Sequence, residues 1–199
     1  NHFNAYGFYA PAVGEYVEMD IMTRLRTPEM KALLEIVEPY SYRDRLTMPK
    51  YILNSAGDQF FTPDSWKFYF NDLQGEKHLR YMPNTDHGLS IEAYMNAASF
   101  YSALLTNTPR PEYSWKIEAD GALEMTCKTA PVKVLLWQAH NPKARDFRLE
   151  EIGAAWTSSP LEGKDGVYRA LPEIKDGYTA FMIEATFSNP KFPMPLVDR

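Results

Sequence analysis

Two spacings of apolar residues alternate along residues 1–108 of the chain. Apolar residues three and four positions apart predict helices, whereas short apolar runs bounded by Gly or Pro predict strands. In chain order, the predicted elements are a helix over 28–37, a strand over 51–53, a helix over 63–73, a strand over 79–82 and a helix over 89–106. Strands and helices that alternate with short connections predict a parallel α/β sheet with flanking helices on its faces.

Proline and glycine mark where these helices begin and end. A threonine precedes a proline at the first helical position at Thr27–Pro28 and again at Thr62–Pro63. Gly75 follows the second helix, where a left-handed residue often ends a helix. The predicted apolar faces are Met30, Leu33, Leu34 and Val37; Trp66, Tyr69, Phe70 and Leu73; and Ile91, Met95, Ala98, Ser102 and Leu105. We expect the face that contains Trp66 to belong to the core.

The pattern changes after residues 109–111, Pro-Arg-Pro. Apolar and polar residues then alternate, which is typical of half-buried strands, and Asp120–Gly121 predicts a hairpin turn. The expected strands are 113–119, 123–127, 132–138, 154–158, 167–171 and 178–187. Such strands, with Gly turns and no good helix, predict a small antiparallel β-sandwich. We therefore divide the chain into an α/β part, 1–108, and a β-sandwich-like domain, 109–199.

The composition of the chain excludes several classes of binding partner. The 199 residues carry 26 acidic and 21 basic side chains, a formal net charge of −5, and no basic run interleaved with aromatics, which excludes a nucleic-acid groove. No uncharged apolar stretch approaches the ~18 residues of a membrane span, so no membrane insertion is expected. The single cysteine, Cys127, excludes a disulfide scaffold within the chain. Small molecules or other proteins are the expected partners, and the oligomeric state stays open.

Two loops carry the candidate chemistry. Asp58 follows the first predicted strand, and His87 follows the next strand, just before a helix. In open α/β sheets the functional crevice lies outside the carboxyl ends of the strands, so both side chains are expected at one place. A carboxylate that accepts from one imidazole nitrogen fixes the tautomer and leaves the other nitrogen as a general base. An acid followed by a His matches the second half of the Ser…Asp…His order of α/β-hydrolases.

Structural roles are the alternative for these residues. An Asp after Gly often caps a turn, and a lone loop His is often solvated. Asp86 is the rival acid, but adjacent side chains such as Asp86 and His87 rarely face each other, so we expect Asp86 to be structural. Phe60 and Phe61 either wall a substrate pocket or belong to the core, and neither role is favoured. No metal-ligand spacing links the histidines to Cys127, so neither a metal nor a cofactor is expected.

A nucleophile is missing from the pair. Residues 1–199 contain no Gly-x-Ser-x-Gly, the turn that presents the serine of α/β-hydrolases. Ser55 and Ser90 lie near the two loops without that context, and we assign them to turns or caps. We therefore expect the serine upstream of Asn1, and we expect this fragment to be inactive alone. No targeting segment is visible within the 199 residues.

Five runs of the α/β part form longer motifs: 6–12 (Tyr-Gly-Phe-Tyr-Ala-Pro-Ala), 39–50 (Pro-Tyr-Ser-Tyr-Arg-Asp-Arg-Leu-Thr-Met-Pro-Lys), 56–61 (Ala-Gly-Asp-Gln-Phe-Phe), 75–77 (Gly-Glu-Lys) and 84–87 (Asn-Thr-Asp-His). They resemble the PhoPQ-activated pathogenicity-related protein family over most of 1–108, and more weakly beyond. The resemblance implies the C-terminal part of an α/β-hydrolase-like parallel sheet followed by a β-rich extension. It also implies that Asp58 and His87 stand at the acid and base positions, and that the protein is secreted or periplasmic.

Three functions stay open. The first is the C-terminal portion of a serine hydrolase that cleaves an ester or peptide bond, with His87 as base and Asp58 orienting it. The second is a non-catalytic secreted binding or signalling protein on the same scaffold. The third is a carbohydrate- or protein-binding β-sandwich, although its tryptophans, Trp115, Trp137 and Trp156, are expected to pack in the core.

Overall fold

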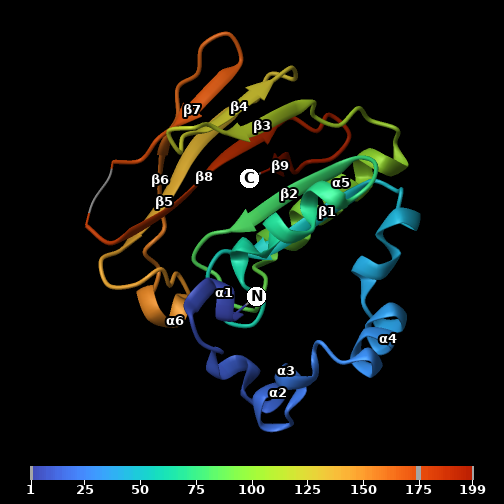
Figure 1. Cartoon of the computed structure of the whole chain (residues 1–199). Coiled ribbons are helices and arrows are strands. Elements are labelled where there is room, and N and C mark those ends of the chain that lie inside the picture. The colour runs from blue at the N-terminus through green and yellow to red at the C-terminus, as the bar shows by residue number, and fades with distance from the viewer. Residues whose placement is uncertain (1, 174–175, 199) are drawn as a thin grey trace.

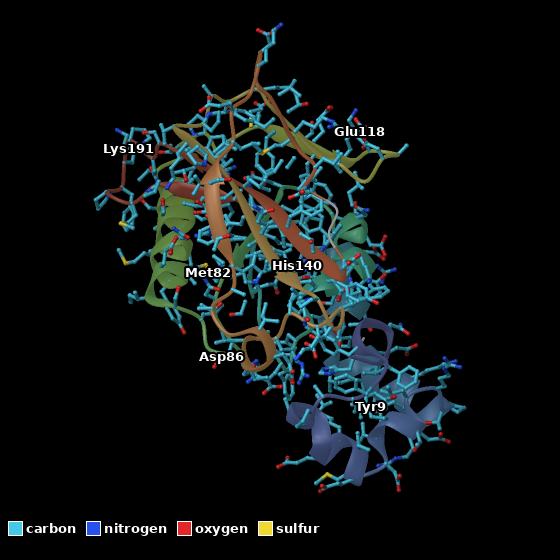
Figure 2. The ribbon with its side chains drawn as sticks, turned by 90° about the vertical axis from the view of Figure 1, so that its left-hand side faces the viewer. Tyr9, Met82, Asp86, Glu118, His140 and Lys191 are labelled. Carbon is cyan, nitrogen blue, oxygen red and sulfur yellow. The ribbon has the colours of Figure 1, made fainter. Side chains whose placement is uncertain are left out.

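The computed structural model describes residues 2–173 and 176–198 (Figure 1). The chain starts with a series of short helices: α1 His2–Tyr6, η1 Pro11–Val13, α2 Gly14–Glu18, α3 Ile21–Arg24, α4 Pro28–Val37 and η2 Pro39–Arg45, where η marks a 3₁₀ helix. The N-terminal helices project away from the strands as a separate lobe that carries Tyr9 (Figure 2). Within the described ranges, no helix combines the length and the apolar character needed to cross a bilayer.

The strands follow this lobe. β1 Lys50–Ser55 and β2 Lys77–Met82 form a parallel pair. The elements between and after them are η3 Pro63–Phe68, η4 Phe70–Asp72, α5 Ile91–Leu105 and α6 Leu149–Ile152. One antiparallel sheet has the order β3-β4-β7, with β3 Tyr113–Ile117, β4 Leu123–Cys127 and β7 Val167–Ala170. The other has the order β6-β5-β8-β9, with β5 Lys133–Asn141, β6 Thr157–Pro160, β8 Tyr178–Phe187 and β9 Leu196–Asp198.

The predicted fold class is wrong. In the described part of the chain, parallel pairing is confined to β1 and β2, and the other paired strands run antiparallel, so there is no extended α/β-hydrolase-like sheet. Residues 1–108 supply two strand-forming runs, and the segment between these runs folds into η3 and η4 instead of a crossover α-helix. The alternation of strands and helices was read correctly in order, but two strands cannot extend into a sheet of the expected kind.

The first predicted helix is confirmed in its limits but not in its packing. α4 begins at Pro28, and the Thr27 hydroxyl accepts a hydrogen bond from the Met30 N–H at 3.3 Å. No α4 residue is buried, and Leu33, Ile36 and Val37 are exposed. A capping residue and helical spacing determine that a helix forms, whereas packing depends on what lies beside it.

The second predicted helix folds as η3 and η4, and the Thr62 side chain makes no capping hydrogen bond. The apolar face is nevertheless confirmed as core, because Phe70 is buried and Trp66, Tyr69 and Leu73 pack against the same cluster. Gly75 has a φ of +72°, and a Cβ there would lie 2.5 Å from the Thr47 carbonyl oxygen. The glycine therefore meets two demands, a left-handed backbone and a close approach of two chain segments.

The third predicted helix is confirmed as α5, but its predicted face is wrong. Ile91 and Leu105, the two ends of the expected stripe, are exposed. The buried residues are Ala93, Asn96, Ser99, Phe100 and Ala103. The helix lies close to its neighbours through small and polar side chains, which an apolar-stripe search passes over.

The antiparallel strands of the second half are largely where the alternation places them. Asp120–Gly121 forms the turn between β3 and β4, with the Gly121 N–H donating to the Glu118 carbonyl at 2.9 Å and Gly121 at a φ of +85°. On β8, Ile183, Ala185 and Phe187 share one cluster. β9 and the short α6 were not predicted.

Two hydrophobic clusters join the parts of the chain. The first combines Phe100 and Ala103 of α5 with Met125, Ala185 and other strand residues, and the second combines Leu79 and Tyr81 of β2 with residues of β5 and β8. The predicted division at residue 108 stays a prediction, and both clusters contain residues from either side of it.

A buried cation lies where β2, α5 and β8 meet. Arg80 has no exposed surface, and its guanidinium donates to Glu184 at 2.9 Å, to Asn96 at 3.0 Å and to Glu92 at 2.5 Å. A fully buried charge is tolerated when it is paired and hydrogen-bonded, as here. Arg80 therefore links three elements that lie up to 104 residues apart in the sequence.

His78, also on β2, connects the end of the chain to this region. Its buried ring contacts Asp198 of β9 at 3.1 Å through Nδ1 and Glu76 at 3.0 Å through Nε2. Burial lowers the pKa of the imidazole, but the hydrogen bonds and charges of Asp198 and Glu76 outweigh it and hold the pKa above its ordinary value. Tyr113 lies against the same ring, and Arg110 pairs with Glu76.

This raised pKa predicts a pH-dependent stability. Protonated His78 contributes stability that is fully present below its unfolded pKa, about 6.5, and is lost as pH rises through the higher folded value. We expect urea unfolding to show a free energy that falls across this window, and His78→Gln to flatten the fall. His140→Gln, whose ring contacts the Thr179 hydroxyl, is the matched control and should keep the slope. An unchanged slope in His78→Gln would contradict this assignment.

Candidate functional site

The register of the parallel pair brings the two candidate loops together. β1 ends at Ser55 and β2 ends at Met82, its partner in the register. The chains stay paired beyond the strands, because the Ala56 N–H donates to the Met82 carbonyl at 2.8 Å and the Gly57 N–H to the Thr85 carbonyl at 3.0 Å. The residues that follow both strands therefore leave the same edge.

Asp58 and His87, predicted as the acid and the base, face each other at this edge. His87 Nδ1 lies 3.2 Å from Asp58 Oδ1 and 3.2 Å from Oδ2. Asp58 is 5% exposed, whereas the His87 side chain is 47% exposed. One side of the imidazole is thus held by a buried carboxylate, and the ring is accessible to solvent. Their catalytic role stays a prediction.

The backbone of the Asp58 loop fixes the carboxylate. Asp58 Oδ1 accepts hydrogen bonds from the N–H groups of Phe60, at 2.7 Å, and Phe61, at 2.9 Å. These two donors hold the side chain in one orientation. The Asp side chain therefore closes its own turn, the structural role that the sequence left open, and also contacts His87.

Phe60 and Phe61 both pack against the His87 ring. Their ring centroids are 5.1 Å and 5.2 Å from the His87 ring, and Phe61 is exposed. Tyr16 of the N-terminal lobe contacts Phe60 edge-on. The two rings form an apolar surface beside the imidazole, and their role as a substrate wall stays a prediction.

The neighbouring polar residues have structural contacts. Asp86 Oδ1 accepts from the Gly88 N–H at 2.9 Å, as expected of a turn residue. Gln59, which was not singled out from the sequence, accepts the His87 backbone N–H through its side-chain oxygen at 3.2 Å. Gln59 thereby fixes the backbone of His87 from the loop that carries Asp58.

The backbone of Gly57 packs closely against the 141–152 loop, next to the site. A Cβ on Gly57 would lie 2.8 Å from both the Leu149 nitrogen and the Thr85 oxygen, so the three segments meet only with glycine here. The Leu149 N–H donates to the Gly57 carbonyl at 3.0 Å. Close packing of backbone, which a sequence shows only as an unremarkable glycine, sets the position of Asp58.

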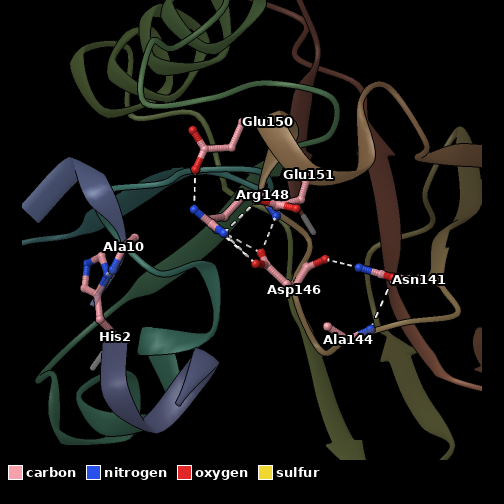
Figure 3. Close-up of polar contacts among 8 residues, drawn as sticks. All are labelled: His2, Ala10, Asn141, Ala144, Asp146, Arg148, Glu150 and Glu151. Carbon is pink, nitrogen blue, oxygen red and sulfur yellow. Dashed lines mark hydrogen bonds and ion pairs between the residues drawn. The ribbon is translucent and has the colours of Figure 1, made fainter. Parts of the chain in front are cut away.

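The same loop contacts the N-terminal segment through Arg148, whose acidic partners are drawn in Figure 3. Arg148 is paired with Asp146 at 2.7 Å and also with Glu150 and Glu151, and its guanidinium lies 5.4 Å from the ring centroid of Tyr6. His2, which the sequence left unassigned, is buried and contacts the Phe60 carbonyl oxygen through Nε2 at 2.7 Å. The start of the chain is thereby fixed against the Asp58 loop.

Cys127 and the tryptophans of the second half pack against the hydrophobic clusters. Cys127 packs against the first cluster, and burial raises the pKa of its thiol, which favours the unreactive form. The three tryptophans of the second half contact the second cluster, which confirms them as core residues. Among residues 2–173 and 176–198, no group of three or more His, Cys, Asp or Glu side chains is placed to hold a metal ion.

A β-rich body with a carboxylate–imidazole pair on two strand-end loops is thus in place, and comparison with known proteins gives its family. The chain belongs to the PhoPQ-activated pathogenicity-related protein family, whose family model matches residues 1–148. It is 35% identical over 212 aligned positions to autocrine proliferation repressor protein A of Dictyostelium discoideum. That match covers 94% of this chain and 43% of the relative, so the chain spans less than half of the relative's length. No solved structure matches it significantly.

Proposed function

We propose that Asp58 and His87 are the acid and base of a hydrolytic site that cleaves an ester or peptide bond. The observation that carries this proposal is the contact of His87 Nδ1 with both oxygens of a buried, backbone-fixed carboxylate, at 3.2 Å each. A carboxylate so placed selects the Nδ1–H tautomer and leaves Nε2 as the proton acceptor. The half-exposed ring can then reach a group that lies outside the described residues.

The proposed reaction is acyl transfer to water. His87 Nε2 takes the proton of a serine hydroxyl as the oxygen attacks the carbonyl carbon, and it then gives that proton to the leaving group. Asp58 stabilises the imidazolium formed in between. Water, activated by the same nitrogen, then releases the acyl group. The serine and the oxyanion donors are proposed to come from polypeptide outside residues 1–199, and the relative's greater length is compatible with this.

Location and substrate are part of the proposal. Membership of the family supports export to the periplasm or beyond the cell. The exposed Phe61 ring beside His87 supports a substrate with an apolar group next to the scissile bond. A small-molecule ester or a peptide has this character.

A second candidate function is non-catalytic signalling or binding outside the cell. Two observations favour it: the relative is named as a repressor of proliferation, and three apolar side chains of α4, Leu33, Ile36 and Val37, are exposed. On this alternative, the Asp58–His87 contact would serve only to fasten the two loops together.

Covalent labelling with a fluorophosphonate distinguishes the hydrolase from the non-catalytic signalling or binding protein. The probe reacts with a serine only when a base has activated it. We expect the whole protein, which contains this chain and the proposed serine segment, to be labelled on one serine outside residues 1–199. A folded whole protein that takes no label would overturn the hydrolase and leave the signalling function.

A further inference from the structure

A second feature of the molecule is a pocket away from Asp58 and His87. Its volume is about 430 Å³, and neither Asp58 nor His87 lines it. Residues of β2, β3, β4 and β8 line it, and its walls are mostly aromatic and apolar, including Trp66, Trp115, Phe147, Phe181 and Met182. Small-molecule sites commonly have volumes of roughly 300–1,000 Å³ and walls of this kind, with a few polar groups that fix the orientation of the ligand.

One polar group in the wall is a donor without a partner. Trp156 lines the pocket and is 8% exposed, and its indole N–H is buried without a hydrogen bond among the described residues. The residue is firmly held, because its backbone N–H and C=O are both bonded to the Asn84 side chain, at 2.9 Å each. A buried donor that is left unpaired costs free energy, and an acceptor from a ligand would satisfy it.

The last strand supplies the opposite kind of polar group, an acceptor. Asp198 of β9 lines the pocket and is 4% exposed. Its Oδ2 contacts His78 Nδ1 at 3.1 Å, and the carboxylate also interacts with the Tyr113 side chain. Within residues 2–173 and 176–198, however, Oδ1 is buried without a hydrogen bond. An O–H or N–H of a ligand would satisfy this oxygen, whereas a ligand carboxylate would be repelled by it.

The charged groups of the lining already have partners. Asp64 pairs with Arg145, also in the lining, at 2.7 Å and with Lys67 at 2.9 Å. Asp198 pairs with His78. A ligand therefore needs no charge of its own, and a charge that it brought among these apolar walls without a free partner would be costly to bury.

The unpaired donor and acceptor lie at different levels of the sheet. Thr157, which follows Trp156, is level with Phe181 of β8, because both pair with the same residue of β5. Asp198 pairs with Ala185, further along β8. A strand rises about 3.3 Å per residue, so the two levels are roughly 13 Å apart. A ligand that reaches both groups is therefore elongated.

We propose that this pocket binds an elongated, uncharged aromatic molecule that has a hydrogen-bond donor at one end and an acceptor at the other. The donor lies at Asp198 Oδ1 and the acceptor at the Trp156 N–H. The aromatic body lies against the tryptophan and phenylalanine rings of the walls. This inference is independent of hydrolysis at His87, because the pocket shares no lining residue with the Asp58–His87 pair.

The first test uses 4-acetyl-4′-hydroxybiphenyl and the 199-residue chain. This uncharged probe carries a hydroxyl and a carbonyl at opposite ends of two linked rings, and we expect calorimetry to show saturable binding at one site. Its methyl ether cannot donate, so it leaves Asp198 Oδ1 unpaired and should bind about tenfold more weakly. In Asp198→Leu, which has no acceptor at this position, the affinities of the two compounds should differ by less than about twofold.

The second test concerns the buried donor. Trp156→Phe keeps an aromatic ring but lacks the N–H, and it should weaken binding of the acetyl probe about fivefold. 4-Hydroxybiphenyl has no carbonyl to accept from the indole, so the same variant should change its affinity by less than about twofold. Trp137→Phe is the matched control, because Trp137 does not line the pocket, and it should bind both compounds as the wild type does.

Three results would contradict the proposal. Absence of saturable binding to the folded wild-type chain would overturn it. Equal affinities of the wild-type chain for the probe and its methyl ether would also overturn it, and this comparison decides the matter even if Asp198→Leu does not fold. Equal losses for the acetyl probe and 4-hydroxybiphenyl in Trp156→Phe would overturn the placement of the acceptor end, because they would indicate a loss of ring packing alone.

Discussion

Asp58→Asn in the whole protein is expected to lower the rate of fluorophosphonate labelling and of ester hydrolysis by about 10³–10⁴-fold. The amide can donate to His87 Nδ1, which would stabilise the tautomer that has its proton on Nε2 and so block that nitrogen as a base. His87→Ala removes the base itself and should cost about 10²–10⁴-fold. Rates measured with a p-nitrophenyl ester and with the probe should fall together.

Asp86→Asn is the matched control for this prediction. It removes the same charge one residue from His87, but its carboxylate accepts from the Gly88 N–H instead of the imidazole. Asparagine can keep that contact through its side-chain oxygen, so the rate should stay within about twofold of wild type. Wild-type turnover in Asp58→Asn or His87→Ala would remove both residues from the chemistry.

Arg80→Leu is expected to destabilise the chain by about 3–5 kcal/mol, the largest effect on folding that the structure predicts. The variant leaves the buried Glu184 carboxylate without its 2.9 Å partner and frees Asn96 from its contact. A buried charge that loses its partner is more costly than a pair removed together. Urea denaturation, followed by far-UV circular dichroism, measures the loss.

Two further variants make this prediction specific. Arg80→Leu combined with Glu184→Leu removes both charges and should recover a substantial part of the stability. Arg110→Leu breaks the pair with Glu76, which is partly exposed, and should cost no more than about 1 kcal/mol. A double variant less stable than the sum of the two single variants would contradict the account of Arg80 as a charge that needs its partner.

Local sequence patterns predicted where many helices, strands and turns form. They did not predict which faces are buried or how the strands pair, because these depend on packing. The Thr27–Pro28 cap and the Asp120–Gly121 turn act within a few residues, and both formed as expected. The face of α5 depends on its neighbours, which accept small and polar residues such as Asn96 and leave Ile91 exposed. The sheet could not be predicted, because two parallel strands carry the same local pattern whether or not others join them.

The sequence predicted the two main residues of the candidate site but not the contacts that support them. Asp58 and His87 were found because each follows a strand, and parallel strands end at one edge. Their supports were missed because they act across long separations. His2 contacts the Phe60 carbonyl 58 residues away, and Leu149 approaches Gly57 at a distance that only glycine allows. No spacing in the sequence indicates such contacts.

The tautomer of His87 in the 199-residue chain tests the central claim most directly. Two-bond ¹H–¹⁵N correlation spectra of the neutral ring distinguish a proton on Nδ1 from one on Nε2. The contact with Asp58 predicts that the neutral His87 ring carries its proton on Nδ1. His2 is an internal control: its Nε2 contacts the Phe60 carbonyl and its Nδ1 accepts from the Ala10 N–H, so its proton should lie on Nε2 in the same spectrum. His87 with its proton mainly on Nε2, or exchanging freely between both nitrogens, would contradict the proposal that Asp58 prepares this ring to act as a base.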